Sequence, residues 1–355
     1  MAIIKFMLFG YTPKQFIERI IQEFITPQTT LGKKIKLLFI KKHQTKFKRN
    51  LNLNLLYNLD YNSATFDFGY VLLMIDKYAK INKINFNVII IKRKRKEIKD
   101  WYTSFNLEKI NKRINNMLVP LAESFTRCNK IIIFENFKDI KKHKNEIFFP
   151  YDLKKNIYFF DYKFFYNYLS SPDNYDGIKT KNLFKKEVNN LISVENKNNK
   201  KIVTLTIRNY SFEEERNTDP DFWLNVLSYF DHKYYVIVIP DIESLNDQKY
   251  YDYFKKYFIF YECAKSIQMK IALYEIANLN FFPHTGNSVL SQLNKNSCSI
   301  TYLKTFENKK NLNTNYFNKI GQHVGKNYKF LTNRHKICWN SNIDELVKTS
   351  NELLN

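Results

Sequence analysis

The chain has 355 residues, of which 44% are hydrophobic and 17% aromatic, so it can bury two domain cores and is not a disordered chain. Lysine and arginine number 57 against 34 acidic residues, a net charge of +23. Only seven glycines occur, and the sequence contains neither a G-x-G-x-x-G fingerprint nor a P-loop, which excludes two common nucleotide-binding motifs.

The N-terminal half alternates segments typical of strands and of helices. We expect strands at 3–9, 35–40, 86–91 and 130–134, and helices at 13–24 and 113–124. Between them, apolar residues from Phe68 to Ala79 recur at helical spacing and predict a helix with a buried face. Such alternation is typical of a parallel sheet covered by helices.

The composition changes between residues 166 and 200, where turn formers and charges cluster, among them Asp176-Gly177. We therefore expect a linker there, between a first domain at 1–165 and a second at 201–340. A closing helix at 341–355 is expected to pack back on the first domain.

The second half restarts the alternation. Strands are expected at 201–207, 234–239, 280–283 and 299–303, and helices at 266–278 and 287–293. Another helix should begin at Asp219-Pro220, an N-cap acid followed by proline at the first helical position. The chain is thus predicted to be a two-domain α/β protein whose second domain is Rossmann-like and of the nucleotide-binding type.

The segment His284-Thr285-Gly286-Asn287-Ser288 follows a short apolar strand and opens a helix. Backbone N–H groups, hydroxyls and an amide at such a turn can hold a phosphate, and open α/β sheets bind ligands at the carboxyl ends of their strands. The alternative is an ordinary turn with Asn287 or Ser288 as the cap. His284 can donate to a phosphate or act as a base, or it is a loop histidine without such a role.

Arg208 and Asn209 directly follow the first strand of the second domain. Arginine at that position can form a bidentate pair with a diphosphate; the alternative is an ion pair with a glutamate of the loop 213–217, which also contains Arg216. Glu275, in the helix before the 284–288 turn, can reach a ribose or is simply an exposed helical glutamate.

Asp67 falls in the first turn of a predicted helix. A carboxylate there can face an interdomain cleft and act as a general base, or it only stabilises the helix N-terminus. The histidines lack metal-ligand spacing, and the four cysteines form no C-x-x-C pair. We therefore expect reduced thiols and no metal site.

A dense basic run consists of Lys92, Arg93, Lys94, Arg95 and Lys96. Such a run is either a solvated segment or a contact with anionic lipid or nucleic acid. Because the lysine- and asparagine-rich composition is typical of an AT-rich coding genome, we do not expect nucleic acid as the principal partner. No apolar run approaches the roughly 20 residues of a membrane span. We expect a cytoplasmic protein with peripheral contact at the inner face of the membrane.

Four stretches resemble GT-B-fold glycosyltransferases of bacterial surface-polysaccharide synthesis, particularly those found with lipopolysaccharide genes. They are residues 63–69, 113–121, 204–209 with 215–217, and 272–275 leading to 284–288. The Thr285–Ser288 turn is similar to the donor-diphosphate loop of heptosyltransferase-like enzymes, and the strand before Arg208 resembles the arginine-bearing strand of fucosyltransferase-like enzymes. No glycine-rich N-terminal loop is visible, although such a loop commonly borders the acceptor in this family.

The resemblance implies two Rossmann-like domains with parallel sheets facing across a cleft. It also implies metal-independent transfer of a sugar from a nucleotide-sugar donor to a glycan or lipid-linked acceptor, without a cofactor. The second domain would hold the donor and a base in the cleft would deprotonate the acceptor. The donor-binding residues would be Arg208, Asn209, Glu275, Thr285, Gly286, Asn287 and Ser288; the base would be Asp67 or, in second place, His284. A non-catalytic GT-B-like binding module and a basic nucleic-acid-binding protein remain alternatives.

Overall fold

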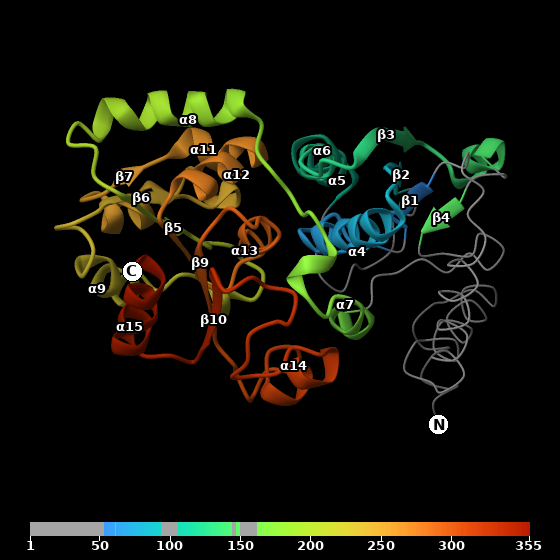
Figure 1. Cartoon of the computed structure of the whole chain (residues 1–355). Coiled ribbons are helices and arrows are strands. Elements are labelled where there is room, and N and C mark those ends of the chain that lie inside the picture. Colours follow the sequence, from blue (N-terminus) through green and yellow to red (C-terminus); the bar gives the residue numbers. More distant parts are fainter. Residues whose placement is uncertain (1–52, 61, 94–105, 144–146, 150–161) are drawn as a thin grey trace.

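The computed structural model of the protein describes residues 53–60, 62–93, 106–143, 147–149 and 162–355 (Figure 1). The elements expected at 3–9, 13–24 and 35–40 lie outside the described residues, as do Lys94, Arg95 and Lys96 of the basic run. Two separate parallel sheets with flanking helices make up the described part.

The first sheet has the strand order β3-β2-β1-β4, and all its pairings are parallel. Its strands are β1 (Leu53–Asn58), β2 (Phe86–Ile91), β3 (Cys128–Phe134) and β4 (Ile147–Phe149). The helices of this half are α4 (Asp67–Asn82), α5 (Leu107–Arg113), α6 (Val119–Glu123) and α7 (Tyr162–Tyr168). A π-helical turn, Ile114–Leu118, joins α5 to α6. The strand expected at 86–91 and the helix through Phe68 to Ala79 are present.

Helix α4 is buried over most of its circumference because the first sheet covers one side and the second half of the chain the other. Gly69 allows this close approach: a Cβ atom there would lie 2.8 Å from Leu293 Cδ1 and 3.0 Å from Val289 Cγ1. Lys83 caps the end of the same helix: its backbone is left-handed (φ 55°), and its N–H bonds to the last carbonyls of the helix.

The second sheet has the order β10-β9-β8-β5-β6-β7, again entirely parallel. Its strands are β5 (Ile202–Thr206), β6 (Tyr235–Ile239), β7 (Phe258–Ile259), β8 (Leu279–Phe282), β9 (Ser299–Leu303) and β10 (His335–Trp339). Counted along the chain this is the Rossmann order 3-2-1-4-5-6. The order reverses between β5 and β8, so the carboxyl ends of these two strands border the crevice in which such sheets bind ligands.

The helices of the second half are α8 (Asn182–Glu195), α9 (Pro220–Ser228), α10 (Gln248–Tyr251), α11 (Tyr261–Lys265), α12 (Ile267–Ile276), α13 (Ser288–Gln292), α14 (Thr314–Ile320) and α15 (Ile343–Leu354). Side-chain caps mark the start of several of these helices, although α8, α11 and α13 have none. Asp219 caps α9 by accepting from the Phe222 N–H, as expected. Asn342 and Glu345 form a reciprocal capping box at the start of α15.

The expected return of the last helix to the first domain is wrong. Helix α15 packs on α9 and β8 of the second half. Its buried Leu346 belongs to the same apolar core as Trp223 and Val226 of α9, so its apolar side is already covered there.

The segment 166–200, expected as a linker, is hydrogen-bonded to both halves. The buried Asp76 of α4 accepts from the N–H groups of Asp176 (2.7 Å) and Gly177 (2.9 Å). On the other side, the Ile178 N–H donates to the Leu293 carbonyl at 3.0 Å. Gly177 has φ +75°, and a Cβ atom there would lie 2.2 Å from the Leu293 oxygen. Glycine is therefore required where the linker passes between the halves.

An aromatic cluster also joins the two halves. Tyr70 of α4 lies 4.5 Å from Phe165 and 6.1 Å from Phe330 between ring centroids, and Tyr166 lies 5.0 Å from Tyr328. These side chains belong to one apolar core that continues from the first half into the second. Within the described part of the chain, none of the helices has the length and apolar character needed to cross a membrane.

Candidate functional site

The 284–288 turn follows β8 at the crevice edge and is largely closed on itself. Ser288 donates from its amide (3.3 Å) and its hydroxyl (2.8 Å) to the Thr285 carbonyl. Thr285, Asn287 and Ser288 are buried. Phe66, from the start of α4, covers the turn: a Cβ atom on Gly286 would lie 3.0 Å from Phe66 Cδ2. The turn therefore faces the first half of the chain directly.

Arg208 follows β5, which pairs in parallel with β8, so it emerges at the same sheet edge as the turn. Its guanidinium donates to the side-chain oxygen of Asn217 and to the Phe212 carbonyl, and its amide donates to Thr218 Oγ1 at 2.8 Å. Burial lowers the pKa of Arg208 to about 10. The alternative of an ion pair with a loop glutamate is not what forms; Arg208 instead holds the loop 209–217 in place.

Asn209 turns toward the end of β6 rather than toward the 284–288 turn. Its amide donates to Asp241 Oδ2 at 3.2 Å, and its side chain donates to Asp247 Oδ2 at 3.0 Å. It therefore orients a neighbouring carboxylate at the same edge of the sheet.

Arg216 links the loop 209–217 to the turn. It donates to the His284 carbonyl at 3.2 Å and forms an ion pair with Glu213 at 2.6 Å. The His284 ring packs on Phe317, with centroids 5.9 Å apart, and its Nδ1 is buried without a hydrogen-bond partner among the described residues. Burial, followed by the charges of Arg216 and Arg208, lowers the pKa of His284 well below its usual value. The imidazole is therefore neutral at neutral pH.

Asp67 approaches this group from the first half. Burial raises the pKa of its carboxyl, whereas hydrogen bonds from Tyr162 and Thr65 and the charge of Arg216 lower it. The Thr65 hydroxyl donates to Asp67 Oδ2 at 3.1 Å. Because Arg216 belongs to the second half, Asp67 and the turn lie on facing sides of one interdomain site. A carboxylate with a raised pKa is suited to proton abstraction.

Glu275 is not part of this arrangement, which corrects the expectation for it. It lies near the end of α12, just before β8 begins, and hence at the opposite, amino edge of the sheet. Its carboxylate accepts from the Thr180 N–H (3.0 Å) and the Asn294 amide (2.8 Å) and pairs with Lys185 (2.6 Å). It fastens the linker and α8 to the second half.

Two buried residues at the site were missed from sequence. Asp241, two residues after β6, accepts from the amides of Asn209 and Glu243, and burial raises its pKa. Its position directly after the strand 234–239 was a usable signal. Lys270 of α12 donates to Asn287 Oδ1 at 3.1 Å. A lone lysine in a helix usually indicates a solvated face, so the sequence around Lys270 does not indicate that it belongs to the site.

Ion pairs close the site between the two halves. Lys109 and Arg113 of α5 both reach Glu243, at 2.6 Å and 3.6 Å. Arg113 also donates to the Ala64 carbonyl at 3.4 Å, just before Asp67. The stretch 113–121, which carried part of the family resemblance, therefore borders the site.

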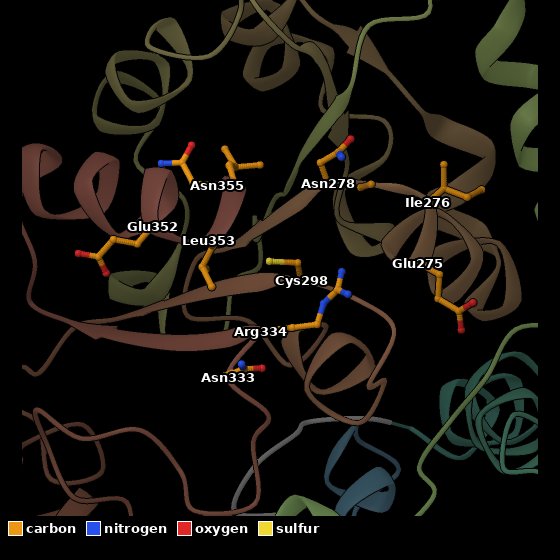
Figure 2. A pocket seen from close by; sticks show the side chains of 11 residues that line it. Glu275, Ile276, Asn278, Cys298, Asn333, Arg334, Glu352, Leu353 and Asn355 are labelled. Atoms are coloured by element: carbon orange, nitrogen blue, oxygen red, sulfur yellow. The ribbon is translucent and has the colours of Figure 1, made fainter.

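A hollow of about 500 Å³ lies elsewhere, at the amino edge of the second sheet (Figure 2). Glu275, Cys298, Arg334 and the end of α15 line it. Neither Arg208, Asp67 nor the 284–288 turn contributes to its wall, so we do not count it as part of the candidate site.

No protein-family model and no curated protein sequence matches the chain. Solved structures do. The fold is similar to the E. coli ADP-heptose LPS heptosyltransferase II, with a TM-score of 0.53 and 8% identity over 86% of this chain and 98% of that one. It is equally similar to a glycosyl transferase family 9 protein from Veillonella parvula, with a TM-score of 0.53 and 8% identity over 86% and 97%. The expected fold class, two Rossmann-like domains of the GT-B kind, is confirmed.

Proposed function

We propose that the protein is a glycosyltransferase that moves a sugar from a nucleotide-sugar donor to a glycan or lipid-linked acceptor. The observation that carries the proposal is the meeting of Asp67, from one domain, with Arg216 and the 284–288 turn, from the other, at the Rossmann crevice. The fold is shared with a protein described as an ADP-heptose heptosyltransferase, which supports a sugar nucleotide as the donor.

In this proposal the second domain holds the donor. Arg216 and the Gly286 N–H face the diphosphate, while Arg208 keeps the loop that carries Arg216 in position. We propose that Asp241, at the end of the strand next to β5, binds a ribose hydroxyl, as an acidic residue at this position does in Rossmann domains.

The chemistry needs one base and one stabilised leaving group. Asp67 takes the proton of the acceptor hydroxyl, whose oxygen forms the new bond to the sugar C1. The bond from C1 to the diphosphate breaks, and the diphosphate leaves with the electron pair. Arg216 and the turn stabilise the negative charge that develops there, so we propose transfer without a metal ion. His284, neutral but with a lowered pKa, is the weaker base.

Donor entry requires a local movement. Phe66 packs against Gly286, which leaves no room for a phosphate on the turn. We infer that Phe66 and the start of α4 move away from the turn when a donor binds. Because Phe66 covers the turn, a second candidate function remains: a protein of this fold that binds a ligand without transferring a sugar.

The acceptor side is proposed to lie near a membrane surface. The basic run begins at the end of β2, where Lys92 pairs with Glu135 at 2.6 Å. A contact of this run with anionic lipid, worth about 1 kcal/mol per lysine or arginine, would hold the first domain near lipid-linked acceptors on the cytoplasmic face.

A nucleotide panel tests the function. Thermal shift and calorimetry with UDP, GDP, ADP and CMP should show binding by at least one, and the corresponding nucleosides should bind more weakly because they lack the phosphates. Arg216→Ala should lower the affinity for that nucleotide roughly tenfold or more, the usual effect of losing a hydrogen bond to a charged group. Stabilisation by oligonucleotides alone would reject the proposal. Binding without donor hydrolysis or transfer would favour the binding module.

A further inference from the structure

Lys270 carries a charge that its surroundings do not balance. It lies in the first turns of α12, and only 3% of its surface is exposed. Moving an ammonium group out of water costs several kcal/mol unless a counter-charge compensates. The helix adds no compensation, because the N-terminal end of a helix is its positive end.

The partners of Lys270 are few. Its ammonium has three N–H donors, and it donates to Asn287 Oδ1 at 3.1 Å. Among the described residues no carboxylate forms an ion pair with it. Burial disfavours its charged form; the Cys263 thiol and the charge of Asp241 favour that form, while the charge of Arg113 opposes it.

Asp241 is also shared. Its charge acts on Arg113 and Arg208 as well as on Lys270, and its oxygens accept from the amides of Asn209 and Glu243. Arg113 and Arg208 have a further carboxylate each, Glu243 and Glu213, whereas Asp241 is the carboxylate whose charge acts on Lys270. The positive charge of Lys270 is therefore only partly compensated, and a bound anion beside it would supply the missing negative charge.

The position of Lys270 indicates where such an anion would bind. Its hydrogen-bond acceptor, Asn287, belongs to the 284–288 turn, so the ammonium lies directly behind the turn. The Arg216 guanidinium is bonded to the same turn, through the His284 carbonyl. Once Phe66 has moved away from the turn, an anion seated there would lie near both cations.

We propose that Lys270 is a binding residue for a phosphate or diphosphate group held at the 284–288 turn. The inference rests on the proposed function only for the source of that group, a nucleotide; the anion chemistry rests on the charge balance described above. An apolar side chain of similar length would fill the same space, so a purely structural Lys270 is replaceable by methionine.

Isothermal titration calorimetry tests this with Lys270→Met and with Lys265→Met, an exposed lysine of the neighbouring helix α11. The ligands are inorganic pyrophosphate, the nucleoside diphosphate selected by the panel, and its nucleoside. Lys270→Met should bind pyrophosphate and the diphosphate roughly ten- to hundredfold more weakly, as expected for a lost hydrogen bond to a charged group. Nucleoside binding, and all binding by Lys265→Met, should stay at the wild-type level.

A pH series gives a readout that packing alone would not change. Burial lowers the pKa of Lys270, and only its protonated form binds an anion. Pyrophosphate affinity of the wild type should therefore fall as the pH rises through the lowered pKa of Lys270, and this fall should be absent in Lys270→Met. Should that variant not fold, Lys270→Arg keeps the charge to higher pH, so the fall should move upward.

The outcomes separate the two proposals. Equal binding of the diphosphate by wild type and Lys270→Met overturns the role of Lys270 and leaves the function standing. The same holds if the fall in affinity occurs at the same pH in Lys270→Arg as in the wild type. Lys270-dependent binding of pyrophosphate without binding of any nucleotide overturns the function and leaves the anion site. A wild type that binds neither overturns both.

Discussion

Replacing Gly177 by alanine should destabilise the protein far more than the same change at Gly325. Both glycines have positive φ, +75° and +82°, so both substitutions incur the cost of about 1–2 kcal/mol for an L-residue in left-handed backbone. The two positions differ in the free space around the added Cβ atom. A Cβ atom at Gly177 would lie 2.2 Å from the Leu293 oxygen, whereas at Gly325 nothing lies within 4 Å.

The clash at Gly177 falls on backbone that cannot rotate away. Moving it disturbs the Ile178-to-Leu293 bond, worth about 1 kcal/mol. It also disturbs the amide bonds to the Asp76 carboxylate, and a bond to a charged group is worth about 1.5–3 kcal/mol. We expect Gly177→Ala to lower the free energy of unfolding by about 4 kcal/mol, and Gly325→Ala by about 1–2 kcal/mol.

Urea denaturation followed by circular dichroism, at one pH for wild type and both variants, measures the difference. Gly325→Ala is the matched control, because it shares the backbone conformation and lacks the contact. If the two variants lose the same stability, the linker is not clamped between Asp76 and Leu293, and its place in the structure is wrong.

Three further outcomes are expected. Burial lowers the pKa of His335 to about 4, so the unfolded chain takes up the proton first. The free energy of unfolding should then fall from pH 6.5 towards 4, by about 3 kcal/mol more than in His335→Gln; equal pH curves would contradict this. Asp67→Asn should slow sugar transfer about 10²–10⁴-fold with nucleotide affinity retained in calorimetry; unchanged turnover would remove Asp67 as the base. Arg208→Lys cannot reach both Phe212 and Asn217, so amides 209–217 should exchange faster by mass spectrometry, and unaltered exchange would show that Arg208 does not hold the loop.

The sequence predicted the elements whose apolar spacing is regular and missed those in which polar residues are buried. Strand β1 was not expected, because two of its six residues, Asn54 and Asn58, are asparagines, which are depleted in strands. In the structure Asn54 is buried and accepts from the Asn87 side chain of β2 at 3.0 Å. That partner comes from the neighbouring strand, so the local sequence of β1 does not predict the burial of Asn54.

Helix α12 shows the same limit at the candidate site. Its polar residues Lys270 and Glu275 fit a solvated face, yet both side chains are buried. Helix α8 covers α12 on the outside and α6 of the first domain contacts it as well. Periodicity reports which residues are apolar and not which distant segments cover the rest, so Lys270 was missed and Glu275 was assigned to the wrong edge.

The two flanks of the crevice are closed by different forces. The aromatic rings of Tyr328 and Phe330 come just before β10, at one end of the second sheet, and pack on rings of the first domain. Glu243 follows β6, on the other side of the β5–β8 crevice, and holds Lys109 through an ion pair that is partly exposed. Salt screens such a pair and leaves ring packing almost untouched. At high ionic strength the Lys109–Glu243 contact should therefore weaken first, while the aromatic contact between the two halves should persist.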